Sequence, residues 1–147
     1  MDDVNELPAS ARELYDAAIA AMAMSYSPYS GYPVGAAVRT ASGRVFAGCN
    51  VENAAYPLGS CAEAGAIAAM VFGGERQIVE VVTVTGGDRP GTPCGGCRQR
   101  LREFSALSVP VYATTEGGAV IALTIEELLP ESFGPEFLHA TPDIHPI

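Results

Sequence analysis

Residues 61–63 read Cys-Ala-Glu, and residues 93–97 read Pro-Cys-Gly-Gly-Cys. Thiols at Cys61, Cys94 and Cys97 make a set of three ligands that suits a zinc ion. A structural zinc site is closed by four protein ligands, whereas an open site keeps its fourth position for water. Because one ion must hold both segments, the two must face each other in the folded chain. This requirement decides how the elements around them are arranged.

Glu63 follows the first of these cysteines by two residues. A carboxylate beside an open zinc site is the proton carrier that hydrolysis by a zinc-bound water needs. Both cysteine segments stand at predicted helix starts, where free N–H groups and the helix dipole favour thiolates. A spacing of three residues places Cys94 and Cys97 on the same side of one helical turn. The sequence therefore predicts a catalytic zinc site with Glu63 as its acid and base.

Other interpretations of these residues were weighed against a catalytic site. A lone C-x-x-C motif also fits a redox pair or half of a structural zinc finger. A fourth ligand could come from Cys49, His139 or His145. Cys49 lies in a predicted strand and is interpreted as a small buried apolar residue, and the two histidines as solvated residues of the tail. Glu63 could also be an acid that the helix dipole favours, but this does not explain its place between the ligands.

The remaining elements follow from hydrophobic periodicity and turn signals. Helices are predicted over residues 8–25, 61–72, 94–104 and 124–129, and strands over 34–39, 44–51, 78–85, 109–115 and 119–123. Helices and strands in this order predict an α/β fold with a mixed five-stranded sheet and helices on both faces. A length of 147 residues suits one domain over residues 1–147.

Composition and charge exclude several classes of function. The net charge is −9 and all eight basic residues are arginines, so no lysine can form a Schiff base. An acidic protein repels polyanions, which argues against nucleic acid and anionic membranes as partners. The arginines 98, 100 and 102 are interpreted as a solvated helix face in preference to a phosphate site.

The apolar fraction of 48% is high for a small monomer, and no run is as long as a membrane span. We therefore expect burial between subunits. The N-terminus does not read as a targeting signal, and the four cysteines are expected to be reduced in the cytoplasm.

From the first helix to about Leu138, the chain resembles the small homotetrameric cytidine deaminases. The resemblance rests on blocks in the same order at residues 33–37, 48–54, 56–59, 61–63, 93–99, 128–130 and 132–135. It implies a three-layer α/β/α sandwich that binds Zn²⁺. The implied reaction is hydrolytic deamination of cytidine and deoxycytidine to uridine and deoxyuridine in pyrimidine salvage. It also implies a cytoplasmic homotetramer with shared active sites.

The resemblance further implies the residues that bind the nucleoside. Asn50 and Glu52 would hold the ribose hydroxyls, and a spacing of two puts them on one face of a strand. Tyr32 stands where the family usually has a phenylalanine near the base, and the backbone N–H of Ala62 would bind the base carbonyl oxygen.

Two further aromatic residues, Tyr56 and Phe133, correspond to family residues that reach a neighbouring subunit's pocket. If they do so here, each active site is completed by another chain. The alternative for Phe133 is that it plugs the core of its own chain.

One departure from the family pattern concerns Ala64, where the motif commonly continues with arginine. Three thiolates on Zn²⁺ leave a net negative charge, which an arginine at the sulfurs would soften. We expect Arg98 to provide this cation.

Blasticidin S deaminases, which also lack the arginine, are the alternative enzyme, and a non-catalytic zinc-binding module is the alternative outside catalysis. Residues 50–53 and 132–135 favour cytidine as the substrate, and Glu63 argues against a module without activity.

Overall fold

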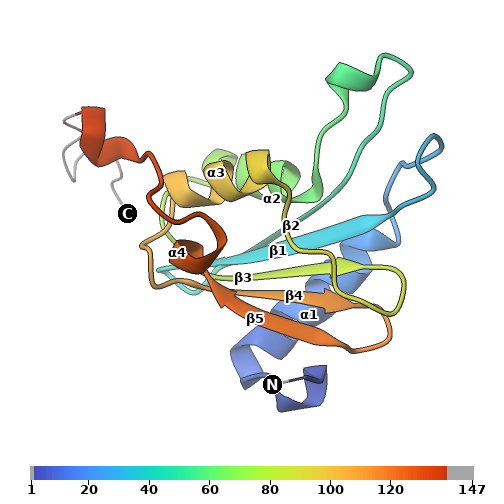
Figure 1. Ribbon diagram of the computed structural model, residues 1–147, viewed down its shortest axis with the longest axis horizontal. Coiled ribbons are helices and arrows are strands. Elements are labelled where there is room, and N and C mark those ends of the chain that lie inside the picture. Colours follow the sequence, from blue (N-terminus) through green and yellow to red (C-terminus); the bar gives the residue numbers. More distant parts are fainter. Residues whose placement is uncertain (1, 139–147) are drawn as a thin grey trace.

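A mixed five-stranded sheet forms the middle layer of the protein, shown by a computed structural model that describes residues 2–138 (Figure 1). His139 and His145 lie outside the described residues. The strands stand in the order β2-β1-β3-β4-β5, with β3 and β4 parallel and every other neighbouring pair antiparallel. Their bounds are β1 Val34–Thr40, β2 Val45–Cys49, β3 Ile78–Thr85, β4 Pro110–Thr115 and β5 Val120–Thr124.

Helices cover both faces of this sheet (Figure 1). Helix α1 (Ala9–Met22) packs on one face, and the other face carries α2 (Ala62–Phe72), α3 (Gly95–Glu103) and the short α4 (Ile125–Leu128). Three 3₁₀ helices, Val4–Glu6, Tyr56–Leu58 and Pro135–Leu138, complete the described elements. This arrangement confirms the predicted three-layer α/β fold. None of the described helices has the length and apolar character needed to cross a membrane.

Alternation along β3 explains why both faces are covered. Val82 and Val84 belong to the apolar core under α1, together with Leu14. Val81 points the other way, into the core that includes Met70 of α2. Because successive strand residues face opposite sides, a strand with buried residues at almost every position needs a helical layer on each side.

Two glycines let the helices approach the β1–β2 pair closely. A Cβ added at Gly48 would lie 2.4 Å from the backbone nitrogen of Ala66 in α2. One added at Gly35 would lie 1.9 Å from the carbonyl oxygen of Ala18 in α1. No side chain fits at either position, so glycine sets the distance between the sheet and the helix that carries Glu63.

The second strand is shorter than predicted, because β2 ends at Cys49 and not at Val51. The Asn50 side chain binds backbone groups of residues 32 and 34, and Val51 forms isolated bridges with Tyr26 and Ser60. The chain thus leaves the sheet, and Asn50 and Glu52 belong to a loop instead of sharing a strand face. This loop and the one before β1 extend from the same end of the sheet (Figure 1).

Candidate active site

The three predicted metal ligands converge at the N-termini of two helices. Cys61 is the N-cap residue of α2 and Cys94 that of α3, and Cys97 lies in the first turn of α3. Their Sγ atoms all lie within 4.8 Å of one another, and those of Cys61 and Cys94 are 3.9 Å apart. A tetrahedral ion with Zn–S bonds of about 2.3 Å needs sulfurs roughly 3.8 Å apart, so the three thiols fit zinc. Cys49 is not in this cluster.

The three thiols differ in how readily they lose a proton. The backbone N–H of Cys97 donates to Cys94, and this contact lowers the pKa of the Cys94 thiol. Burial raises the pKa of Cys61, and burial together with the charge of Glu63 raises that of Cys97. Crowded thiolates repel one another, so a bound cation is what stabilises all three in the charged form.

Glu63 follows the Cys61 N-cap in the first turn of α2, and only 5% of its surface is exposed. Burial raises the pKa of its carboxyl group above the usual range. Its own backbone N–H, the Cys97 thiol and the charge of Arg100 act in the opposite direction. A carboxyl group with a raised pKa holds a proton more readily than an ordinary glutamate does, which suits a group that takes up a proton and passes it on.

The expectation that Arg98 faces the sulfurs is wrong. Its guanidinium donates to three oxygen atoms: the carbonyl of Pro93 at 2.7 Å, the carbonyl of Leu128 at 2.8 Å and the hydroxyl of Thr92 at 2.9 Å. These bonds tie the loop before α3 to the end of α4. The Arg98 guanidinium therefore stabilises the segment that carries Cys94, and all three of these hydrogen bonds go to oxygen atoms and not to ligand sulfurs.

Arg100 stands where the missing cation was expected. Its Nη1 atom lies 3.7 Å from Sγ of Cys97, and its charge lowers the pKa of Glu63. Gly96 lies next to the same nitrogen of Arg100. A Cβ added at Gly96 would lie 3.3 Å from it. The spacing of three residues from Cys97 is the sequence signal that would have identified Arg100.

The solvated helix face predicted for this arginine cluster also fails at Arg102. The residue is buried, with its Nε atom 2.8 Å from the Ser132 hydroxyl and its Nη2 atom paired with Glu136. Arg102 thus fastens the segment after α4 to α3. The three arginines of one helix have three different structural tasks.

A cavity of about 410 Å³ opens beside the thiols. It is lined by Glu63, Cys61, Cys94 and Ala62, and by four of the predicted nucleoside-binding residues, Tyr32, Asn50, Glu52 and Tyr56. Ala62 is the first residue of α2, so its backbone N–H has no acceptor within the helix. The sequence did not single out Ser30, Thr83, Thr85, Gly91 and Thr92, which complete much of the remaining wall.

Asn50 is held in place by backbone groups on both sides of its amide. Its Oδ1 atom accepts from the Val34 N–H at 2.9 Å and also from the Ser25 hydroxyl, and its Nδ2 atom donates to the Tyr32 carbonyl at 2.9 Å. An amide nitrogen has two N–H groups, so one remains to donate to a ligand. Asn50 thus links the start of β1 to the pocket wall.

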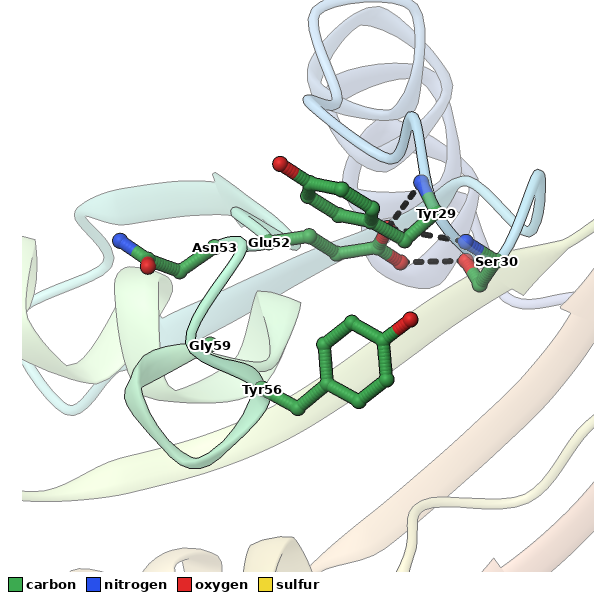
Figure 2. A pocket seen from close by; sticks show the side chains of 6 residues that line it. All are labelled: Tyr29, Ser30, Glu52, Asn53, Tyr56 and Gly59. Atoms are coloured by element: carbon green, nitrogen blue, oxygen red, sulfur yellow. Dashed lines mark hydrogen bonds between the residues drawn. The ribbon is translucent and has the colours of Figure 1, made fainter.

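Glu52 is held by the loop before β1 (Figure 2). Its Oε1 atom accepts from the backbone N–H groups of Tyr29 and Ser30 at 2.9 and 3.0 Å, and the Ser30 hydroxyl donates to Oε2. The Ser30 hydroxyl, followed by its N–H, lowers the pKa of this carboxyl group. Glu52 therefore stays ionised to a lower pH than an ordinary glutamate, and Oε2 keeps one lone pair for a ligand.

Tyr56 and Phe133, which the resemblance places in a neighbouring subunit's pocket, have different surroundings in this chain. Tyr56 lines both its own chain's cavity and an adjoining one of about 300 Å³, where its ring lies 5.8 Å from that of Tyr29 (Figure 2). Phe133 does not line the cavity beside the thiols. It stacks on Phe137 with ring centroids 5.3 Å apart, and 54% of its surface is exposed.

Comparisons with known proteins agree with this geometry. Residues 8–113 match the family model described as the cytidine and deoxycytidylate deaminase zinc-binding region. The chain is 41% identical to a cytidine deaminase of Sporosarcina psychrophila over 114 residues, which cover 78% of this chain and 84% of that protein. It is 40% identical to one of Halalkalibacterium halodurans, covering 81% of this chain and 90% of that protein.

Solved structures give the same result for the fold. The crystal structure of cytidine deaminase from Burkholderia pseudomallei superposes with a TM-score of 0.79 at 40% identity and covers 83% of this chain and 98% of that one. The enzyme from Mycobacterium leprae gives a TM-score of 0.74, also at 40% identity, and the match covers 84% of this chain and all of that one. The chain therefore belongs to the zinc-binding cytidine and deoxycytidylate deaminase family.

Proposed function

We propose that the protein catalyses the hydrolytic deamination of cytidine and deoxycytidine, releasing ammonia and giving uridine and deoxyuridine for pyrimidine salvage. The observation that carries this proposal is a zinc-compatible trio of thiols beside a buried carboxyl group, both lining one cavity. The relatives and solved structures described above bear the name cytidine deaminase, which favours cytidine over other aminopyrimidine nucleosides.

Cys61, Cys94 and Cys97 would hold the zinc ion in this proposal. When bound, zinc would activate a water molecule for attack by lowering its pKa from about 15.7 toward roughly 7. Arg100, with its guanidinium at Cys97 and its charge acting on Glu63, would offset part of the negative charge of the thiolates. This assigns to Arg100 the part that Arg98 cannot play.

Glu63 would move the protons of the reaction. Its buried carboxylate would take the proton that water loses and deliver it to ring N3 of the base. As N3 gains this proton, the oxygen of the activated water would bond to C4. The proton that remains on that oxygen would then pass through Glu63 to the amino group, so that the C4–N bond breaks, ammonia leaves and the C4–O bond becomes a carbonyl. One carboxyl group would thus act as base and then as acid.

The remaining pocket residues would fix the nucleoside in front of Glu63. The unused N–H of Asn50 and the unused lone pair of Glu52 suit the hydroxyl groups of the ribose. The free N–H of Ala62 at the start of α2 suits the base carbonyl oxygen, and the Tyr32 ring suits its flat face.

We also propose that residues 1–147 form a single domain and that the enzyme is a homotetramer, in which Tyr56 and Phe133 contribute to a neighbouring subunit's site. Large apolar side chains on the surface support an interface: Phe72 is 94% exposed, Tyr56 74% and Leu58 71%. The cytoplasm is the proposed compartment because zinc-binding thiols need a reducing environment. Light scattering of the purified protein tests the tetramer.

The function is tested by adding cytidine or deoxycytidine to purified, zinc-loaded protein and following both absorbance and ammonia. We expect equimolar loss of the substrate and release of ammonia. Removal of zinc with a chelator should abolish the reaction, and readdition of zinc should restore it. Zinc-loaded protein that leaves both nucleosides unchanged would refute the proposal.

A further inference from the structure

We infer that Gly91 is a positioning residue for substrate binding, because its missing side chain leaves the space that the phenol of Tyr32 occupies at the pocket wall. This inference rests on the proposed function, in which Tyr32 faces the base. The two residues come from different loops, one before β1 and one between β3 and α3, and both line the cavity that contains Glu63.

A side chain at position 91 could not coexist with the phenol of Tyr32 in its present position. A Cβ added there would lie 2.6 Å from the Tyr32 hydroxyl oxygen, and 3.2 Å from Cγ2 of Thr85. The φ angle of Gly91 is not positive, so its backbone conformation alone does not demand glycine. The lack of space beside the Tyr32 hydroxyl, and to a lesser extent beside Thr85, is therefore what disfavours a side chain at this position.

The backbones of both loops are held by hydrogen bonds, so the phenol at the end of the Tyr32 side chain is the part that would move to relieve such a clash. The Tyr32 backbone donates to the Ser30 hydroxyl at 3.0 Å and accepts from Asn50 at 2.9 Å. The N–H of Gly91 donates to the Thr85 hydroxyl at 3.0 Å. A methyl group at position 91 would therefore displace the phenol, and with it the aromatic wall of the pocket.

The hydroxyl oxygen of Tyr32 is the one atom that the added Cβ would approach to less than 3 Å, and the next, Cγ2 of Thr85, would lie at 3.2 Å, so the severe part of the clash is specific to tyrosine. A phenylalanine at position 32 would keep the ring and remove the contact below 3 Å, so a methyl group at position 91 would meet only the milder contact with Thr85. The two positions are thus a matched pair: Tyr32 requires Gly91, whereas phenylalanine at position 32 does not.

The test is a double-mutant cycle of wild type, Tyr32→Phe, Gly91→Ala and the double variant, with KM and kcat measured on cytidine. We expect Gly91→Ala to raise KM about tenfold in the Tyr32 background and less than about twofold in the Tyr32→Phe background. Its kcat, zinc content and Tm should stay near the wild-type values, since a loss of fold would lower all three. Gly86→Ala in the same loop is the matched control, because a Cβ at Gly86 meets nothing within 4 Å.

A second readout does not depend on turnover. With ring-labelled tyrosine, the NMR signal that Tyr32→Phe removes should shift in Gly91→Ala and stay in place in Gly86→Ala. An inactive wild type would refute the proposed function, whereas the NMR comparison would still decide the fit of the pair. An unmoved Tyr32 signal in Gly91→Ala, or the same rise in KM in both backgrounds, would overturn the inference.

Discussion

The Nη1 atom of Arg100 lies 3.7 Å from Sγ of Cys97, the residue that precedes Arg100 by about one helical turn on α3. This contact places a cation at the Cys97 sulfur although the residue that follows Glu63 is Ala64. Because the same arginine acts on Glu63, it connects the charge of the metal site to the proton carrier.

We expect Arg100→Met to weaken zinc binding by about tenfold or more, because the ligand thiolates lose a compensating charge. Competition with a chelator measures this effect. Arg98→Met is the matched comparison and should leave zinc affinity within about threefold of the wild type, while removing three hydrogen bonds and lowering stability by about 2–4 kcal/mol. Equal loss of zinc affinity in both variants would contradict the separate tasks of the two arginines.

Replacing one ligand should abolish stable zinc binding. Cys97→Ser replaces a buried thiolate with a hydroxyl, which is a poorer zinc ligand. We expect the zinc content to fall well below the roughly one ion per chain expected of the wild type. Cys49→Ser is the control, because Cys49 lies outside the cluster. Zinc content is measured by elemental analysis after gel filtration. A Cys97→Ser protein that keeps a full complement of zinc would argue against this ligand set.

Glu63→Gln should keep its zinc and lose at least about 100-fold in kcat, the usual contribution of a general acid and base. The amide has nearly the same shape but cannot carry the proton. Turnover, zinc content and Tm are measured together. Glu126→Gln, which removes an exposed carboxylate from α4, should have wild-type kinetics. Full turnover in Glu63→Gln would remove Glu63 from the mechanism.

The pH dependence of substrate binding should report on Glu52. The Ser30 hydroxyl lowers the pKa of Glu52, so the carboxylate persists to lower pH and its contribution disappears only as the pH falls through that lowered pKa. Ser30→Ala should raise the pKa of Glu52, and the acid-side increase in KM should then begin at a higher pH than in the wild type. KM measured between about pH 4 and 7 tests this.

Ser27→Ala is the control for that experiment, since the Ser27 hydroxyl bonds to Ser25 and not to Glu52. Superimposable pH profiles for wild type and Ser30→Ala would show that Glu52 does not govern binding in acid.

Gly48→Ala should destabilise the fold by about 3 kcal/mol or more, because its methyl group would overlap the backbone of α2. Gly65→Ala, on the facing side of the same contact, is the matched control. Its added Cβ would lie 3.5 Å from the Cα of Gly48, which is an ordinary contact distance. Because alanine is a better helix former than glycine, the free energy of unfolding should stay the same or rise by up to about 1 kcal/mol. Unfolding in urea measures both, and comparable stability of the two variants would contradict the close approach of α2.

Much of the fold follows from local signals in the sequence. The β-branched run 78–85 forms β3 with the predicted bounds, and Thr124 caps α4 with Glu127 in a capping box. Prediction failed at the end of β2, where the side chain of Asn50 takes backbone partners that a longer ladder would have used. Hydrophobic periodicity depends only on which residues are apolar, so it cannot show that a side chain competes with the strand for backbone hydrogen bonds.

The sequence by itself determined the three thiols, the carboxyl group beside them and the layered α/β fold, because helix starts, strand periodicity and ligand spacing are all local. Only the tertiary structure decided which arginine reaches the sulfurs and which glycine admits Tyr32. Arg98 and Arg100 differ by two positions on one helix, and their partners depend on what packs around that helix. Tyr32 and Gly91 meet only because strands and helices bring two distant loops to one end of the sheet, and no local pattern encodes that contact.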